Sequence, residues 1–308
     1  FKFISQSAVI TMVVAFLGFE IFLAPTVTAD QLPITKPTNV TIASNLLSTP
    51  TPEPTISLPL VEDLSDSLEE QITSEAAKTG PTQDATDYCM NVPVVMYHHV
   101  QPLDMSDLLG HKALTLDNTI FDEQMQYLSD HGYKALAAED LFNALITRTP
   151  LPEKSIIITI DDGYDDNYTY AFMTAKKHHM IMNFMIPTGL IGKSGYMQWD
   201  HLKEMKESPY ARIYNHTTSH APLGLITKEQ ITMEVRTANE QLASELGLDN
   251  KIVTYPYGSY DEEAVEDLKE LGMTGAFTTD MGTEHCLSNI MRLPRLRIGN
   301  APMSDYGF

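Results

Sequence analysis

Residues 155–164 read SIIITIDDGY, and this stretch decides the fold. Ser155–Ile160 is a continuous apolar run of the kind expected for a strand buried on both faces of a parallel sheet. Two carboxylates, Asp161 and Asp162, follow directly at its end, where (β/α) barrels build their active sites. Neighbouring residues there point differently, so one Asp can bind a metal while the other handles a proton. The alternative is a turn rich in Asp and Gly that leads into a helix, and the stretch alone leaves both interpretations open.

Other apolar runs rich in Val, Ile and Tyr alternate with helical patterns along the second part of the chain. The further candidate strands are Val92–Tyr97, Tyr133–Leu136, Met180–Ile186, Ala211–Asn215, Ile252–Tyr255, Gly275–Thr278 and Leu293–Ile298. The helical patterns Thr119–His131, Lys228–Leu246 and Glu262–Leu271 each stop before a glycine, which is a common helix end. A repeating βα order predicts an α/β fold with a mostly parallel sheet or barrel. Residues 92–308 have a suitable length for one such barrel domain.

The beginning of the chain predicts export. Residues 8–27 are nearly all apolar and are enough to span a bilayer, and residues 27–29 (VTA) resemble a cleavage signal. We interpret residues 1–29 as a signal peptide or a membrane anchor, and both imply a secreted or cell-surface protein. Residues 30–91 are rich in Pro, Ser and Thr and then acidic, with too little apolar surface to offset their ordering entropy. They are therefore expected to form a disordered linker.

Charge and cysteine content limit which partners and which metal sites the chain can have. The chain has 20 Lys and Arg against 41 Asp and Glu, a net charge of −21. Such a balance argues against nucleic acid, whose phosphates are bound by basic side chains. It suits a neutral or cationic partner, although solubility alone would explain it equally well. The two cysteines, Cys89 and Cys286, lie far apart and form no CxxC signature, so the sequence predicts no cysteine metal site. They could pair, although the sequence does not favour a disulfide.

A second motif with chemical potential is NHTTSH at residues 215–220, directly after a candidate strand. His216 and His220 are four residues apart, so on a helical turn they share one face and can bind one ion through imidazole nitrogens. Such a pair is weak evidence by itself, since most histidines on helices are surface or capping residues. Its position after a strand, like that of the Asp pair, strengthens it. Two His and one Asp leave coordination positions open for water and substrate, as in a catalytic metal site.

Two more strand ends carry candidate groups. The turn TYPYG at residues 254–258 could direct the backbone N–H of Tyr257 at a developing oxyanion, although alone it is an ordinary turn. The first strand ends in MYHHV at residues 96–100. Histidine is the natural proton donor to an amine leaving group at neutral pH, which makes His98 a candidate acid. We interpret His99 as a core histidine with satisfied hydrogen bonds.

In combination, TIDDGY, NHTTSH, TYPYGSY and LPRLRI, in this order, resemble the NodB-type polysaccharide deacetylases of carbohydrate esterase family 4. The resemblance runs from about Val92 to the end of the chain, and the MYHHV opening is similar to the poly-N-acetylglucosamine deacetylase branch. It implies a distorted, incomplete (β/α) barrel with a groove open to a polymer. The implied reaction is metal-dependent removal of N-acetyl groups from poly-N-acetylglucosamine or from peptidoglycan. The alternatives are an esterase acting on O-acetyl polysaccharide and a catalytically inactive carbohydrate-binding module.

The resemblance also implies roles for individual residues. These are general base for Asp161, metal ligands for Asp162, His216 and His220, oxyanion-hole N–H for Tyr257, and general acid for His98. The family's metal is usually zinc, with cobalt or nickel sometimes substituting. Many members carry an Arg before the Pro-Tyr-Gly turn to orient the base, whereas Thr254 stands near that position here, and Arg292 or Arg295 is left to take over the role. The late Leu/His motif is absent, so the acid role depends on His98. Trp199 is expected to pack in the core rather than to line the groove.

Overall fold

The computed structural model describes residues 87–308. The predicted export segment, residues 1–29, and residues 30–86 of the predicted linker lie outside this range. Strand β1 (Cys89–Asn91) shows that folded structure is already present a few residues before Val92, where the sequence places the start of the domain. Among residues 87–308, no helix is both long enough and apolar enough to cross a membrane.

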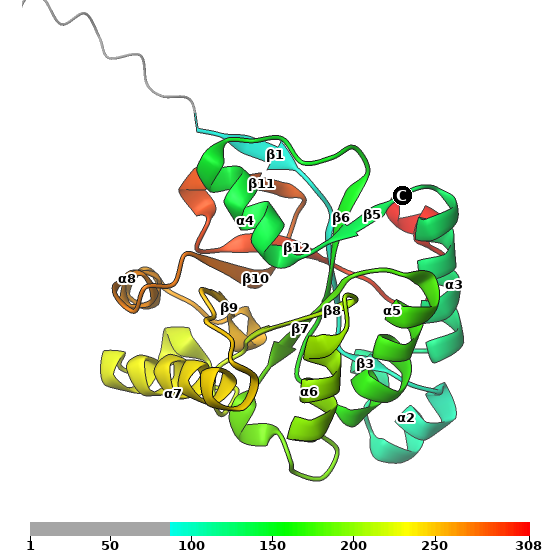
Figure 1. Ribbon diagram of the computed structural model, residues 1–308, viewed down its shortest axis with the longest axis horizontal. Helices are drawn as coiled ribbons and strands as arrows, with labels where there is room; N and C mark the ends of the chain where they lie inside the picture. Colours follow the sequence, from blue (N-terminus) through cyan, green and yellow to red (C-terminus); the bar gives the residue numbers. More distant parts are fainter. Residues whose placement is uncertain (1–86) are drawn as a thin grey trace, which may run out of the picture. The chain divides into compact units, whose positions relative to one another are not determined.

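A closed barrel of parallel strands forms the centre of the fold (Figure 1). Around the barrel, the strands are β2 (Val94–Tyr97), β12 (Leu293–Arg297), β10 (Gly275–Met281), β9 (Ile252–Thr254), β8 (Ala211–Asn215), β7 (Met182–Ile186) and β6 (Ser155–Ile160). The ring closes because β6 also pairs with β2, from Val94 opposite Ile157 to Tyr97 opposite Ile160. An eighth strand, β5 (Lys134–Leu136), pairs with β6 from outside the ring. All eight candidate strands are present with ends shifted by a few residues, and the (β/α) barrel prediction is confirmed.

The barrel is distorted on one side. Strands β8 and β9 pair through a single residue pair, Asn215 opposite Val253. The register between β10 and β12 shifts between Phe277 and Met281. Three strands on this side position candidate residues. His216 follows β8, Tyr257 follows β9, and Arg295 lies in β12.

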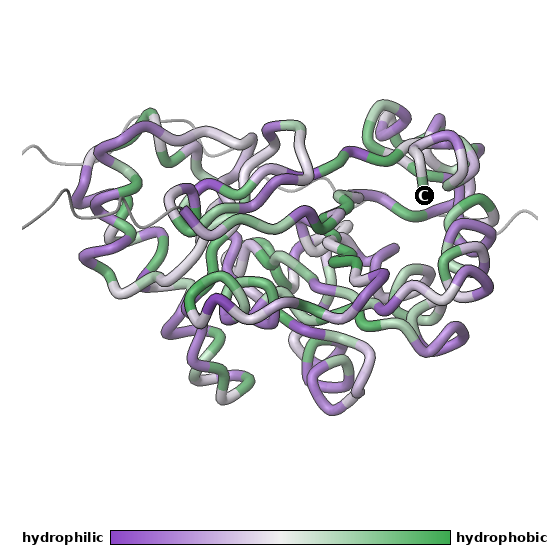
Figure 2. Tube along the Cα trace, turned by 90° about the horizontal axis from the view of Figure 1, so that it is seen from above, coloured by the Kyte–Doolittle hydropathy of each residue, from purple (hydrophilic) through white to green (hydrophobic). Residues whose placement is uncertain are grey.

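Helices cover the outside of the barrel, as Figure 1 shows. They are α2 (Leu103–Leu109), α3 (Asn118–Asp130), α4 (Ala138–Thr147), α5 (Met173–His178), α6 (Trp199–Glu207), α7 (Lys228–Leu246) and α8 (Glu262–Glu270). In Figure 2, hydrophobic stretches follow the central strands, while the outer helices alternate between hydrophobic and hydrophilic residues. This alternation is that of amphipathic helices with one face on the core. Trp199, the first residue of α6, is half-buried and packs against the main hydrophobic cluster, in agreement with the expected core role.

The longest helix, α7, shows how local sequence sets its ends. Thr227 precedes it and accepts a hydrogen bond from the backbone N–H of Gln230, while the Gln230 side chain accepts one from the backbone N–H of Thr227. This reciprocal pair is a capping box. Gly247 ends the helix in the left-handed conformation (φ 67°), which glycine adopts without strain. The observed bounds, Lys228–Leu246, match those predicted from the sequence.

Two small two-stranded sheets lie beside the barrel. One joins β3 (His99–Val100) to β4 (Thr115–Leu116) in parallel. The other joins β1 to β11 (Glu284–Cys286) in antiparallel register, with Cys89 directly opposite Cys286. Single 3₁₀ turns occupy Lys112–Leu114, Thr188–Leu190, Leu223–Leu225, Leu287–Asn289 and Met303–Tyr306.

The cysteines correct one expectation. Cys89 and Cys286 form a disulfide, a pairing that the sequence left open and did not favour. Their separation along the chain, 197 residues, gave no indication of the pairing. Strand β1 pairs with β11 across the fold, so this separation does not keep the two thiols apart.

Candidate active site

All six candidate residues line one cleft of about 580 Å³ at the carboxyl ends of the barrel strands. They are His98, Asp161, Asp162, His216, His220 and Tyr257. The remaining wall includes aromatic and apolar side chains such as Tyr164, Tyr196 and Met281. The structure therefore brings together motifs that are more than 150 residues apart in the sequence, as expected when parallel strands end at one rim.

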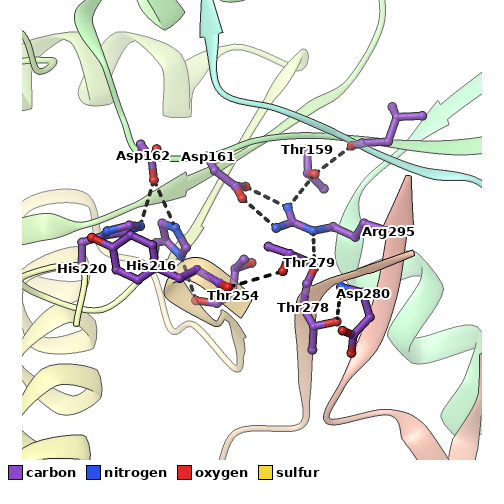
Figure 3. A network of polar contacts seen from close by, with 12 residues as sticks. Thr159, Asp161, Asp162, His216, His220, Thr254, Thr278, Thr279, Asp280 and Arg295 are labelled. Atoms are coloured by element: carbon purple, nitrogen blue, oxygen red, sulfur yellow. Dashed lines mark hydrogen bonds and ion pairs between the residues drawn. The ribbon is translucent and has the colours of Figure 1, made fainter. Parts of the chain in front are cut away.

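Asp162, His216 and His220 offer ligand atoms that all lie within 4.8 Å of one another (Figure 3). Asp162 Oδ1 lies 3.3 Å from His216 Nε2 and 3.1 Å from His220 Nε2. Within residues 87–308 this buried oxygen has no hydrogen-bond partner. Leaving a buried carboxylate oxygen unpaired is costly unless a cation neutralises it. One carboxylate and two imidazoles are also a donor set typical of catalytic zinc, so the residues fit a divalent metal.

The tautomer of His216 is set by a backbone carbonyl. His216 Nδ1 lies 2.8 Å from the carbonyl oxygen of Thr254, which can only accept, so Nδ1–H is the donor. Nε2, on the side of Asp162, is then the nitrogen that can present a lone pair to a metal. Thr254 stands near the position where many members of the resembling family carry an Arg. In this chain its backbone carbonyl orients His216, a candidate metal ligand.

Several residues of the cleft have an unusual backbone. Among residues 87–308, seven non-glycine residues have positive φ, and four of these belong to the motifs of the cleft. These four are Asp162 (φ 75°), Thr217 (φ 67°), His220 (φ 63°) and Tyr257 (φ 60°). Residues with a side chain seldom adopt this conformation, and such strain concentrates at active sites.

Asp161 is held by a buried arginine. Arg295 Nη1 and Nη2 donate to the two carboxylate oxygens of Asp161 at 2.8 and 2.7 Å (Figure 3). The guanidinium is 0 % exposed and also donates to Thr159 Oγ1 and to the carbonyl of Thr278. Burial acts to raise the pKa of Asp161, but the charge and hydrogen bonds of Arg295 hold that pKa below its usual value. Asp161 is therefore ionised and fixed in orientation.

This contact decides between the two arginines that the sequence left open. Arg295 lies against Asp161, whereas Arg292 donates to Glu262 at 2.5 Å on the exposed side of the barrel.

Asp162 differs from Asp161 in its neighbours. Its burial acts to raise its pKa, but His216 and His220 beside it hold the pKa of this carboxyl well below its usual range.

His98 lies on the wall of the cleft at the end of β2. Burial lowers its pKa, and the carboxylates of Asp161 and Asp162 only partly oppose this effect. Its backbone carbonyl accepts a hydrogen bond from Asn167 Nδ2 at 2.7 Å. Asn167 begins a π-helical turn, η2 (Asn167–Phe172), of a kind often found at functional sites.

His99 has the structural role expected of it. It is buried, and its Nδ1 pairs with Asp166 Oδ2 at 2.5 Å. Its ring stacks between His111, at 4.3 Å, and Tyr164, at 3.6 Å. Asp166 also accepts from the backbone N–H of Val100, so it ties β3 to the start of η2. The sequence analysis missed Asp166 and Asn167, whose only signal was the polar run that follows the Asp pair.

Tyr257 lies in η5 (Pro256–Gly258) at the end of β9, with its side chain 70 % exposed. Its ring meets that of His220 edge to face at 4.5 Å between centroids. Gly258 follows with φ 67°, and a Cβ there would come within 2.0 Å of Thr279 Oγ1. The turn is thus pressed against β10, which only glycine permits, and this contact fixes the backbone of Tyr257 at the rim.

Comparisons with known proteins agree with this geometry. Residues 148–276 match the family model of polysaccharide deacetylases. The putative polysaccharide deacetylase YxkH of Bacillus subtilis is 27% identical over 214 residues, covering 69% of this chain and 73% of that protein. The poly-β-1,6-N-acetyl-D-glucosamine N-deacetylase of Escherichia coli K12 is 22% identical, covering 68% of this chain and 36% of the enzyme.

Solved structures show the same fold. The deacetylase PplD of Streptococcus pyogenes, in complex with acetate, superposes with a TM-score of 0.64 and 25% identity, covering 68% of this chain and 92% of that one. IcaB of Ammonifex degensii gives a TM-score of 0.61 with 24% identity, covering 70% and 93%. The segment matched by the family model contains both aspartates, both histidines of the NHTTSH motif and Tyr257. Residues 148–276 thus match the polysaccharide deacetylase domain, and residues on both sides share the fold of hydrolases of that family.

Proposed function

We propose that this protein removes N-acetyl groups from an N-acetylglucosamine-containing polysaccharide of the cell surface, in a metal-dependent reaction. The observation that carries the proposal is the cluster of Asp162, His216 and His220 beside an arginine-bound Asp161. Poly-N-acetylglucosamine is the favoured polymer, because the names of relatives in Escherichia coli and Staphylococcus aureus specify that substrate. Peptidoglycan is the second polymer that the same site would suit.

Asp162, His216 and His220 would hold the metal, with zinc favoured and cobalt or nickel as substitutes. A divalent metal bound there supplies Lewis acidity toward the acetyl carbonyl and lowers the pKa of water. The buried, unpaired Asp162 Oδ1 and the Nδ1–H donation of His216 to Thr254 support this assignment.

The remaining residues would move protons and stabilise charge. Asp161 takes the proton of the attacking water, and Arg295 keeps its carboxylate ionised and aimed. The backbone N–H of Tyr257 donates to the oxyanion of the tetrahedral intermediate. His98 gives a proton to the departing sugar amine. Because burial lowers the pKa of His98, a proton placed on it is readily given up.

The sequence before the barrel bears on where the reaction takes place. The apolar residues 8–27 support export, with residues 1–29 as signal peptide or anchor and the predicted linker, as far as the start of β1, leading to the catalytic domain. We therefore place the enzyme at the extracellular surface, either secreted or held at the membrane. Its partner is the glycan polymer, and the net charge of −21 speaks against nucleic acid.

The test is acetate release from N-acetylglucosamine oligomers by the full chain, with chelator and then with zinc, cobalt or nickel added back. Asp162→Asn should abolish release and metal binding. Asp165→Asn is the matched control, because Asp165 is exposed in the same segment. Release that chelator stops and metal restores supports the proposal. Bound metal without release from these oligomers would favour an O-acetyl substrate, and the absence of both would favour an inactive binding module.

A further inference from the structure

The segment that carries both histidine ligands, residues 215–221, holds an unfavourable backbone. Two of its residues, Thr217 and His220, have left-handed φ although both carry side chains. A strained conformation of this kind persists only where surrounding contacts hold it in place. The contacts that hold this segment therefore determine where His220 lies.

One carboxylate on helix α7 binds the amide side of the segment. Glu234 Oε2 accepts from the backbone N–H of Thr218 at 3.0 Å and from that of Ser219 at 2.7 Å. Glu234 Oε1 accepts from Ser219 Oγ at 2.6 Å. The hydroxyl of Thr218 donates in turn to the backbone carbonyl of Glu234 at 2.8 Å. Four hydrogen bonds thus join Glu234 to the two residues that directly precede His220.

The carbonyl side of the same segment is bound from the opposite direction. The carbonyls of Thr217 and Thr218 accept from the backbone N–H groups of Thr188 and Gly189, at 3.1 and 2.8 Å. A Cβ on Gly189 would lie 2.7 Å from the Thr218 carbonyl oxygen, so only glycine permits this approach. The segment is consequently held on both sides, by a backbone loop on one and by a single side chain on the other.

The charge of Glu234 has no other use in the described part of the chain. It is half-buried and forms no salt bridge within residues 87–308. The helix does not need it, because α7 is capped by Thr227 and packs through Ile231 and Val235. Hydrogen bonds to a charged acceptor are roughly twice as strong as those between neutral groups. Bonds of this strength are suited to holding a strained loop in place.

We propose that Glu234 is a positioning residue of the metal site, which holds the Thr218–Ser219 peptide so that His220 stays aligned with Asp162 and His216. The proposal rests on the proposed function, because it takes those three residues as metal ligands. Partners that orient metal ligands typically change metal affinity by 10- to 100-fold when they are mutated. Glu234 acts through backbone amides rather than through an imidazole, so the sequence motif itself does not reveal it.

The experiment measures metal affinity in Glu234→Gln, Ser219→Ala and Glu240→Gln variants of the full chain. Glutamine keeps the size of Glu234 but removes the charge and one of the two acceptor oxygens. Glu240 is the matched control, an exposed glutamate on the same helix. Zinc and cobalt affinities would be measured by competition with a chelating dye, together with the visible absorption of bound cobalt and the melting temperature of the metal-free protein.

The expected result is a 10- to 100-fold loss of affinity in Glu234→Gln, with an altered cobalt spectrum and a metal-free melting temperature close to that of Glu240→Gln. Ser219→Ala, which loses one hydrogen bond, should lose affinity by less than Glu234→Gln. Affinity of Glu234→Gln within twofold of the Glu240→Gln control would overturn the proposal. If Asp162→Asn binds metal as tightly as the unmodified chain, the metal site itself is wrong. If Asp162→Asn loses the metal and Glu234→Gln keeps it, the metal site is right and the positioning role of Glu234 is wrong.

Discussion

Arg295 and Asp161 form a bidentate ion pair inside the barrel, between β12 and the end of β6. The two residues are 134 positions apart in the sequence. Both are buried, so the pair is shielded from the solvent that weakens ion pairs on the surface. The orientation of the proposed base therefore depends on a residue outside every motif that contains a candidate ligand.

Arg295→Lys should lower kcat by about 100-fold, because a lysine cannot hold both carboxylate oxygens and small displacements of a catalytic group are costly. The unfolding free energy should fall as well, by up to about 3–5 kcal/mol if the pair is broken. Acetate release and urea unfolding measure the two effects. Arg292→Lys is the control, because Arg292 pairs with Glu262 at the surface. Equal kcat in the two variants would contradict a role for Arg295 in placing Asp161.

His98→Ala should reduce kcat by about 10²–10⁴-fold, the usual contribution of a general acid. Metal content should stay unchanged, since His98 is not one of the three clustered ligands. Metal analysis of the purified variant, alongside acetate release, separates the two roles. Loss of the metal in His98→Ala would show that this residue is a ligand rather than the acid.

Tyr257→Gly should retain kcat within about fivefold if the backbone N–H alone stabilises the oxyanion. Glycine keeps the N–H and accepts the φ of 60° without strain. A loss of about 100-fold or more, as for a missing oxyanion donor, would mean that the tyrosine ring contributes instead. The ring borders His220, so KM and kcat should be determined separately.

Reduction of the Cys89–Cys286 disulfide should destabilise the domain without changing the site. The bond spans 197 residues, and the chain-entropy model gives about 5 kcal/mol for a loop of this length. Urea unfolding of Cys286→Ser, compared with the oxidised and reduced parent, measures the effect. Activity in the absence of urea should stay close to that of the parent, because neither cysteine lines the cleft.

Stability should fall between neutral pH and pH 4 because of His285. This residue is fully buried, its Nε2–H donates to the carbonyl of Val92, and its Nδ1 has no partner within residues 87–308. Burial lowers its pKa from 6.5 to about 4. Below pH 6.5 the unfolded chain binds a proton that the folded chain refuses, so stability is lost progressively down to about pH 4. The loss attributable to this group is about 3 kcal/mol.

The comparison that isolates His285 is urea unfolding of the parent and of His285→Gln at pH 7, 5.5 and 4.5. Glutamine can keep a donor to Val92 but does not titrate. The difference in unfolding free energy between the two proteins should shrink as the pH falls. A constant difference would show that acid sensitivity arises elsewhere.

The sequence predicted the barrel, and it predicted that the candidate residues meet at one rim, because both depend on short-range patterns. SIIITI has the pattern of a strand buried on both faces, and each motif directly follows a strand whose neighbours end at the same rim. The end of α7 was predictable for the same reason, since Gly247 is a local stop signal. Features that are determined by residues close together in the chain can be predicted from a single sequence.

Contacts made across the fold were less accessible. The disulfide arises from the pairing of β1 with β11, for which neither strand carries a local signal. The choice of Arg295 over Arg292 follows from strand alternation, because Arg295 points into the barrel and Arg292 lies before the strand, at the surface. Asn167 binds the main-chain carbonyl of His98, and Asp166 binds the main-chain N–H of Val100. Because any residue offers these backbone groups, such hydrogen bonds leave no motif in the sequence.

Closure of the barrel sets an order for assembly. Strand β12 inserts between β10 and β2, so β2 receives its second barrel neighbour only after the chain has been synthesised beyond β12. The same strand brings the guanidinium that holds Asp161. A nascent chain that ends before Leu293 would thus contain every motif residue except this anchor, in an open and slow-forming parallel sheet. The arginine that fixes the proposed base is therefore in place only after β12 has joined the ring.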